Sequence, residues 1–315
     1  TLKPEEPTMS GAVVTLATDA CAATVDLRGG GIAQLTWRGR DLLESYPHPG
    51  GPDPAPLHAN TVLAPWPNRT RDARFSFDGR SHRLTVTEPD RNTALHGFVA
   101  GRQWTVSSAR ADAATLTLAP GPQPGWPWDL RFTVTYRLTD DGLAAGLTVR
   151  NTAGQTAPAA CGVHLYPSAL GAATDDCTLV VPDHRLVPLD DRGLPAGPET
   201  ADRGVLPART NPLRGRLLDH CLHVPGDGGT DILLTGPDGG GVALRTSTGL
   251  RWLQVFTADD RCGLPFPGRP GGRAVAVEPM TAPPDALNSG TGLARLPPGG
   301  ELHCSWTVTA IPPVP

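Results

Sequence analysis

Lysine is almost absent from this sequence of 315 residues: Lys3 stands alone, and the other 26 of the 27 basic residues are arginines. Schiff-base chemistry by a lysine in the protein interior is therefore excluded. The formal net charge of −4 shows no excess of positive charge, so we expect no nucleic-acid partner and no acidic membrane surface as a partner. No apolar run approaches the length of a membrane-spanning helix.

Targeting and cofactor motifs are missing as well. The N-terminus lacks the basic-then-apolar pattern of a signal peptide, so we expect a cytoplasmic protein, although a processed mature chain would look the same. No G-x-S-x-G, G-x-x-x-x-G-K-[ST] or H-E-x-x-H motif occurs. The glycines at 29–31 follow a strand pattern but precede no helix pattern, which predicts a turn rather than a dinucleotide site. We expect no cofactor.

Closely spaced cysteines are also lacking. No C-x-x-C pair occurs, which argues against a zinc knuckle, and we expect no metal. An even number of cysteines permits disulfides, but reduced and mostly buried thiols are the favoured interpretation for a chain of this size. The six cysteines stand at positions 21, 161, 177, 221, 262 and 304.

Glycine and proline, by contrast, are abundant, with 37 and 35 residues, or about twice their average share together. Both break helices, which excludes a mostly helical protein and a long coiled coil. The hydrophobic share of 39% and seven tryptophans are enough to build a core and argue against disorder. The composition therefore favours a protein of strands and turns.

Strand patterns recur along the whole chain, and no long helical pattern separates them. The polar link TDDG at 139–142 joins two of them as a hairpin. In the last pattern, Cys304, Trp306, Val308 and Ala310 share one face. These features predict packed antiparallel sheets, in one continuous domain over residues 1–315 because no linker-like segment occurs. The predicted strands cover residues 12–18, 23–27, 32–37, 74–77, 83–87, 104–107, 115–119, 130–138, 143–151, 159–166, 177–181, 231–235, 242–246, 252–257, 274–278 and 303–311.

Polar residues interrupt this apolar pattern in four places. In the first, LAPWPNR at 63–69, prolines stiffen a segment that presents Asn68 and Arg69 beside Trp66. A flat aromatic face beside polar donors is typical of sugar sites, and a surface turn with an exposed arginine is the alternative. In the second, His96 precedes Gly97 and is either a site ligand or a buried structural histidine.

The other two places lie on predicted strands. His164 shares a face with Gly162, which leaves space in front of that face, and with Tyr166, which supplies a hydroxyl. A satisfied core histidine is the alternative. Glu278 shares its face with small residues at the end of a strand that Pro279 would terminate. A buried carboxylate is costly unless it is paired or functional, and a solvated strand end is the alternative.

These segments, in this order, resemble the aldose 1-epimerase (galactose mutarotase) family. The family pattern also includes a strand pair, here at 74–84, and an Asp-led segment, here DHCL at 219–222. Its Q-V-[YF]-T strand is QVFT at 254–257, and its P-D-A-x-N is PDALN at 284–288. Each motif is short, but seven in the correct order span nearly the whole chain. The resemblance implies an all-β fold, a large antiparallel β-sandwich of the galactose mutarotase-like supersandwich type, with a sugar cleft across one sheet face.

The resemblance also implies an activity, the interconversion of the α and β anomers of a free aldohexose. His164 matches the general acid, which protonates the ring oxygen, and Glu278 matches the general base, which takes the proton of the anomeric hydroxyl. Such a reaction needs one acid and one base, without metal or cofactor. We expect a small-molecule sugar as substrate and a monomer or homodimer. Arg69, His96 and Asp219 match sugar-binding positions, and we expect Asn68, Tyr166 and Gln254 to contact the sugar as well.

Three alternatives stay open. A non-catalytic sugar-binding protein could share the fold, although both the acid and the base positions are filled here. A hexose-6-phosphate mutarotase should add basic residues around the cleft, for which Arg71, Arg74 and Arg102 are the candidates. A glycoside-processing enzyme would need two carboxylates, which Asp219 and Glu278 could supply.

Overall fold

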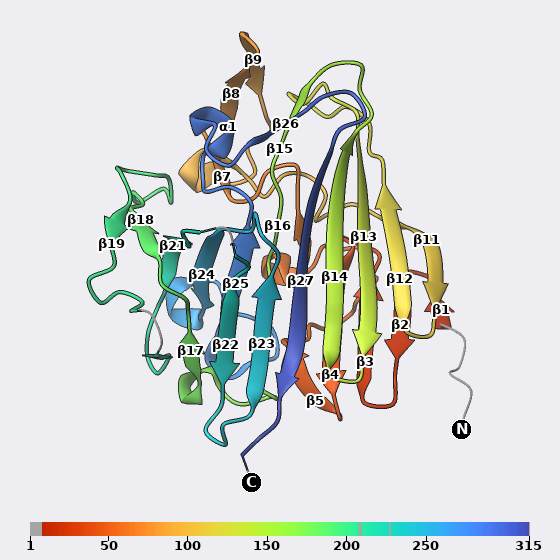
Figure 1. Ribbon diagram of the computed structural model, residues 1–315, viewed down its shortest axis with the longest axis vertical. Helices are drawn as coiled ribbons and strands as arrows, with labels where there is room; N and C mark the ends of the chain where they lie inside the picture. The colour runs from red at the N-terminus through yellow and green to blue at the C-terminus, as the bar shows by residue number, and fades with distance from the viewer. Residues whose placement is uncertain (1–7, 208–209, 227, 315) are drawn as a thin grey trace.

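The chain folds into two layers of antiparallel β-sheet in the computed structural model, which describes residues 8–207, 210–226 and 228–314 (Figure 1). A nine-stranded sheet forms one layer, and a seven-stranded and a five-stranded sheet lie behind it. The alternating strand patterns explain this arrangement, because each sheet buries its apolar face against the opposite layer. The predicted all-β sandwich is therefore confirmed.

The nine-stranded sheet has the order β11-β12-β13-β14-β27-β23-β22-β17-β20. The predicted hairpin is present, with Asp140 and Asp141 as the loop between β13 and β14. On β27 the predicted face of Cys304, Trp306 and Val308 is buried. The strands are β11 (Thr105–Arg110), β12 (Ala113–Leu118), β13 (Leu130–Thr139), β14 (Gly142–Asn151), β17 (Thr178–Val180), β20 (Asn211–Pro212), β22 (Asp231–Thr235), β23 (Gly241–Thr246) and β27 (Glu301–Ile311).

The seven-stranded sheet has the order β19-β18-β21-β24-β25-β16-β6 and carries the candidate site. Its strand β25 is buried on both faces: Val275 and Val277 join the core between the layers, whereas Ala274 and Ala276 pack with Tyr166 on the other face. The strands are β6 (Val62–Leu63), β16 (Gly162–Val163), β18 (Arg185–Val187), β19 (Thr200–Ala201), β21 (Asp219–His223), β24 (Trp252–Ala258) and β25 (Ala274–Met280).

The remaining strands form the five-stranded sheet β1-β2-β3-β4-β5 and three two-stranded pairs. The hairpin of β8 and β9 projects at the top of Figure 1, and the one-turn helix α1 (Ala286–Ser289) packs against it. No helix of the described ranges is long and apolar enough to cross a membrane. The strands are β1 (Thr8–Ser10), β2 (Val13–Ala17), β3 (Cys21–Asp26), β4 (Gly31–Trp37), β5 (Arg40–Leu43), β7 (Arg69–Arg71), β8 (Arg74–Phe77), β9 (Arg80–Arg83), β10 (Thr93–Leu95), β15 (Ala157–Ala159) and β26 (Ala294–Leu296).

Two of the predicted strands are wrong in extent. Residues 84–87 belong to no strand, because β9 ends at Arg83. The predicted strand 159–166 is divided into the end of β15 and the two residues of β16. After β16 the backbone pairing goes on in the same register, because His164 exchanges hydrogen bonds with Asn60 and Thr61 and Leu165 forms a single bridge to Val277 of β25. These hydrogen bonds hold the loop of Asn60 and Thr61 beside His164.

Candidate active site

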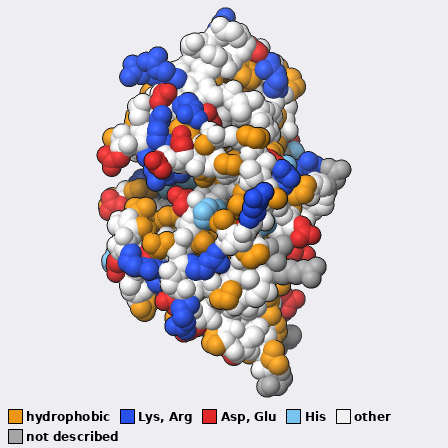
Figure 2. All heavy atoms as spheres, turned by 90° about the vertical axis from the view of Figure 1, so that its left-hand side faces the viewer, with side chains coloured by type: hydrophobic (Ala, Val, Ile, Leu, Met, Phe, Trp, Pro, Cys, Tyr) orange, Lys and Arg blue, Asp and Glu red, His pale blue; other side chains and the backbone are white. Residues whose placement is uncertain are grey.

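All eight predicted site residues line one cavity of about 610 Å³ on the outer face of the seven-stranded sheet. Acidic, basic and histidine side chains come together around a hollow near the middle of the face that Figure 2 presents. The residues come from loops and strands that are far apart in the sequence, so only the fold assembles them. They are Asn68, Arg69, His96, His164, Tyr166, Asp219, Gln254 and Glu278.

Glu278 lies on β25 in the floor of this cavity, and its side chain is almost completely buried. It stands directly opposite Gln254 of β24 in the ladder. The expectation that Pro279 terminates the strand is wrong, because β25 continues to Met280 and Pro279 pairs with Leu253. The neighbouring strands, rather than the proline, therefore hold the carboxylate in place.

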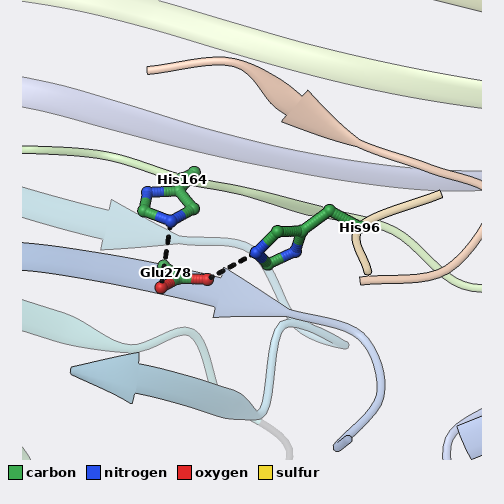
Figure 3. Close-up of side chains that lie close together, drawn as sticks. All are labelled: His96, His164 and Glu278. Atoms are coloured by element: carbon green, nitrogen blue, oxygen red, sulfur yellow. Dashed lines mark ion pairs between the residues drawn. The ribbon is translucent and has the colours of Figure 1, made fainter. Parts of the chain in front are cut away.

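His164 approaches the same carboxylate from the segment after β16. Its Nε2 lies 3.3 Å from Oε1 of Glu278 (Figure 3). Two backbone hydrogen bonds hold the residue, since its N–H donates to Thr61 and its carbonyl accepts the N–H of Asn60. The ring stacks on Tyr166, with centroids 5.2 Å apart and an interplanar angle of 21°. These contacts leave the imidazole little freedom to rotate.

Gly162 does not leave open space beside His164 as expected. A Cβ at this position would stand 2.7 Å from the carbonyl oxygen of Pro279 and 3.0 Å from Cγ of Met280. The glycine instead allows β16 to approach β25 closely. That approach brings the segment of His164 beside the strand of Glu278.

His96 reaches Glu278 from a third direction, with Nε2 4.0 Å from Oε2 (Figure 3). The backbone N–H of Asn68 donates to Nδ1 of His96 at 3.0 Å, and the N–H of His96 donates to the carbonyl of Asn68. Because Nδ1 accepts, the proton of the neutral ring resides on Nε2. His96 therefore presents a hydrogen-bond donor to the cavity.

The hydrogen bond from the N–H of Asn68 to Nδ1 of His96 also determines whether His96, His164 and Glu278 could bind a metal ion. One ligand-type atom from each of His96, His164 and Glu278 lies within 4.8 Å of the others. A metal at Nε2 of His96 would need the lone pair there and the proton on Nδ1, which would face the N–H of Asn68. The donor set fits proton transfer and hydrogen bonding to a ligand, and it does not fit a metal.

Burial dominates the electrostatics of the cluster. It raises the pKa of Glu278 well above its ordinary value, and the negative charge of Asp219 adds to the effect. Burial lowers the pKa of His164 well below 6.5, and so does the proximity of His58. It lowers the pKa of His96 as well. The site therefore disfavours the charged form of both its acid and its base.

A chain of side-chain amides and a carboxylate crosses the cavity floor. The amide of Asn68 donates to Oε1 of Gln254 at 3.3 Å, and Nε2 of Gln254 donates to Asp219 at 2.6 Å. Gln254 is almost fully buried, whereas Asp219 is exposed at the start of β21. The chain orients polar groups toward a ligand, with Asp219 free to accept further hydrogen bonds.

Arg69 lines the cavity with its charge already paired. Its guanidinium makes two hydrogen bonds to Glu88, at 2.8 and 2.9 Å. Thr93 donates a third hydrogen bond to the same carboxylate. This fork fixes the direction of the guanidinium and leaves its remaining N–H groups for a ligand.

Trp66 does not serve as the expected aromatic face of the cavity. It is buried, packs against Trp126 and Phe98, and donates its indole N–H to the carbonyl of Ala94. Its role is to support the loop of Asn68 from the core. The aromatic side chains that do line the cavity are Tyr166 and the half-buried Phe256.

His58 is a cavity residue that the sequence interpretation missed. Its ring centroid lies 4.9 Å from that of His96 and 6.0 Å from that of His164. It belongs to a tight loop in which Leu57, His58 and Asn60 all have positive φ, a strained conformation that is common at functional sites. Asn60 joins this loop to the site by accepting the N–H of Tyr166. No sequence pattern signals these positions, since they fall in a loop rich in proline.

The sequence is similar to those of known proteins along nearly its whole length. The family described as aldose 1-epimerase matches residues 12–308. The chain is 30% identical over 295 residues to an uncharacterized protein of Escherichia coli K12, YihR, and the alignment covers 92% of this chain and 90% of YihR. It is 32% identical to the aldose 1-epimerase of the same organism over 145 residues, or 44% of this chain and 38% of that enzyme.

Solved structures show the same fold at lower identity. The GalM/aldose epimerase homologue from C. elegans superimposes with a TM-score of 0.81 at 19% identity, covering 96% of this chain and 99% of that one. The galactose 1-epimerase from Lactobacillus acidophilus NCFM gives a TM-score of 0.78 at 17% identity, covering 95% and 94%. With its fold, its cavity and a family match over nearly its full length, this chain belongs to the aldose 1-epimerase family.

Proposed function

We propose that this protein is a mutarotase that interconverts the α and β anomers of a free aldohexose, with His164 as general acid and Glu278 as general base. The proposal rests on the 3.3 Å contact between Nε2 of His164 and Oε1 of Glu278. This pair lies in a cavity lined by side chains that can form hydrogen bonds with sugar hydroxyls. An acid and a base this close can act on two oxygens that share one carbon, as the ring oxygen and O1 of a pyranose do.

The reaction needs only two coupled proton transfers. Glu278 takes the proton of the anomeric hydroxyl while His164 delivers a proton to the ring oxygen, and the C1–O5 bond breaks to give the aldehyde. Rotation about C1–C2 exposes the other face of the carbonyl. The reverse transfers then close the ring as the other anomer. No bond to the protein forms at any stage.

Burial of His164 and Glu278 affects the free energy of these proton transfers. Before ring opening the pair is an imidazolium and a carboxylate, and afterwards it is a neutral imidazole and a carboxylic acid. A low-dielectric site disfavours the first state, as the raised pKa of Glu278 and the lowered pKa of His164 indicate. Ring opening removes both buried charges, so burial favours the proton transfers in that direction.

The other cavity residues bind the sugar in this proposal. Asp219 accepts from ring hydroxyls, and Arg69 and His96 donate to hydroxyl oxygens. Asn68 and Gln254 complete the polar floor. His58 contributes a third imidazole above the sugar, and Tyr166 keeps the His164 ring in its plane by stacking.

A neutral aldose is favoured over a phosphorylated one. None of the three arginines considered for a phosphate lines the cavity: Arg71 pairs with Asp285, Arg102 bonds to Gln123, and Arg74 is exposed on β8. The two arginines that do line it are Arg69, paired with Glu88, and Arg91. Polarimetry with sugar phosphates beside the free sugars, and a hydrolysis assay with disaccharides, test this preference.

The experiment is polarimetry of freshly dissolved α-anomers of glucose and galactose. His164→Ala and Glu278→Gln should each lower the enzyme-dependent rate by about 100-fold or more, the usual contribution of a general acid or base. The chain offers a matched control, because His303 and Glu301 form a similar pair on the exposed side of β27, 3.0 Å apart. His303→Ala and Glu301→Gln should keep the wild-type rate.

Two results would overturn the assignment. If the wild type binds aldoses in calorimetry without accelerating mutarotation, the protein is a sugar-binding protein on this fold. If both cavity variants keep wild-type rates while the protein remains active, another pair of groups performs the proton transfers.

A further inference from the structure

Two of the six cysteines meet between the layers of the sandwich. Sγ of Cys161 lies 3.1 Å from Sγ of Cys304, although 143 residues separate them in the chain. Both side chains are buried. No other pair of cysteine sulfurs is in such contact among the residues that the structure describes. The pair was expected to be reduced, like the other four cysteines.

The two residues belong to opposite layers. Cys304 is on β27 in the nine-stranded sheet, opposite Leu147 of β14. Cys161 directly precedes β16 of the seven-stranded sheet and makes two hydrogen bonds with Thr281. The carbonyl of Cys161 accepts the N–H of Thr281, and the N–H of Cys161 donates to the Thr281 hydroxyl. Both backbones are therefore held by their own sheets, and the sulfurs face each other across the core.

We propose that Cys161 and Cys304 form a disulfide that joins the two layers whenever the protein folds in the presence of a low-molecular-weight disulfide such as glutathione disulfide. The sulfurs need to approach by only about 1 Å to reach a bond length of about 2.05 Å. The inference does not depend on the proposed enzymatic activity.

The chemistry balances as two thiol–disulfide exchanges. One cysteine thiolate attacks a sulfur of glutathione disulfide, which gives a mixed disulfide and releases one glutathione. The second cysteine thiolate attacks the protein sulfur of that mixed disulfide and releases the second glutathione. The protein loses two hydrogens, and glutathione disulfide is reduced to two molecules of glutathione.

The link should form during folding rather than afterwards. In the folded protein, the contact with Cys161 and burial raise the pKa of Cys304 well above its ordinary value, so little thiolate is present and an oxidant has no access. Once formed, the disulfide is protected from reductants because both sulfurs are buried. The disulfide closes a loop of 143 residues, and a cross-link that closes a long loop restricts the unfolded chain most.

The test compares the full chain produced in a host with an oxidising cytoplasm and in one with a reducing cytoplasm. Free thiols are alkylated in denaturant, and the protein is digested and analysed by mass spectrometry. We expect a peptide cross-linked between positions 161 and 304, lighter than the two free peptides by two hydrogens, only in the oxidised sample. The variant Cys262→Ser, which removes the exposed thiol, should give the same result.

Thermal unfolding supplies an independent measurement. The oxidised wild type should melt at least about 5 °C above the same protein treated with dithiothreitol in denaturant and refolded. The Cys161→Ser/Cys304→Ser variant should melt at one temperature under both conditions. The proposal is overturned if both cysteines are fully alkylated in the oxidised sample, or if Cys304 is cross-linked to any other cysteine.

Discussion

At the scale of single residues, most of the candidate site could be predicted, because its chemistry depends on residue types that stand out in apolar surroundings. Glu278 is conspicuous as a carboxylate at the end of AVAV, and His164 as an imidazole within a strand pattern. His58 is the counterexample. Nothing around it in the sequence is unusual, and only a run of positive φ angles turns its ring toward His96 and His164.

His58 provides the first prediction. His58→Phe keeps a flat ring but removes both nitrogens, so the variant would lose the hydrogen bond that we propose His58 makes to the sugar. Since such a bond contributes about 1 to 1.5 kcal/mol, we expect kcat/KM for mutarotation to fall about tenfold, mainly through a higher KM. Because the proximity of His58 is one of the two causes that lower the pKa of His164, the part of the pH profile that reports His164 should shift to higher pH. Polarimetry over a range of sugar concentrations measures both constants.

His48 is a matched control for this change. It also has a positive φ, of 57° against 56° for His58, but it is exposed and lies outside the cavity. His48→Phe should leave kcat and KM unchanged. Equal losses in the two variants would show that the effect comes from the strained backbone and not from the cavity.

At the scale of elements, long alternating strands could be predicted and short connecting ones could not. Strands such as β13, β14 and β27 carry their own pattern of period two, so their sequence alone specifies a buried face. β6 and β16 have two residues each and show no pattern. They exist because Gly162 lies between Leu63 and Met280 in the sheet, a pairing over long range in the sequence.

The loop that carries His96 gives the second prediction. Gly97 has φ of +71°, and a Cβ there would stand 1.9 Å from the carbonyl oxygen of Ala64. Gly97→Ala should therefore displace the loop, lower the stability by about 3 kcal/mol and abolish most of the activity. Chemical denaturation and polarimetry measure the two effects.

Gly79→Ala is a control that tests the strain of a positive φ in the absence of a steric clash. It has φ of +75° in the turn between β8 and β9, with no atom within 4 Å of an added Cβ. Gly79→Ala should cost only about 1 kcal/mol and leave activity intact. A comparable loss in both alanine variants would mean that strain alone, and not the approach of Ala64, limits position 97.

At the scale of the whole molecule, the buried titratable groups of the cavity lower the free energy of unfolding. The sandwich buries a continuous apolar core between its layers, yet its outer face encloses two titratable groups whose neutral forms are favoured. Groups of this kind destabilise the folded state at pH values where the unfolded chain would ionise them. The cavity should therefore leave a pH-dependent mark on the unfolding free energy.

The third prediction follows from the sign of the Glu278 shift. Its folded pKa is raised, so its contribution to stability is fully present below the ordinary value of 4.5 and is lost as the pH rises toward the folded pKa. Glu278→Gln removes this loss. The stability advantage of the variant over the wild type should thus grow above pH 4.5, by up to about 1.4 kcal/mol per pH unit.

Denaturant unfolding at pH 4.5, 6 and 8 provides the measurement, with Glu301→Gln on the exposed side of β27 as the control. The control should show no trend of this size. A constant difference between wild type and Glu278→Gln across this range would contradict a raised pKa for the buried carboxylate.

The sequence by itself determined the class of fold and singled out the candidate acid and base, because strand periodicity and isolated polar residues are local properties. The tertiary structure alone decided the distances: His164 beside Glu278, the tautomer of His96 through Asn68, the place of His58, and the contact of Cys161 with Cys304. Each of these depends on the pairing of segments far apart in the chain. A one-dimensional pattern does not encode such pairing, because the packing of two layers sets it.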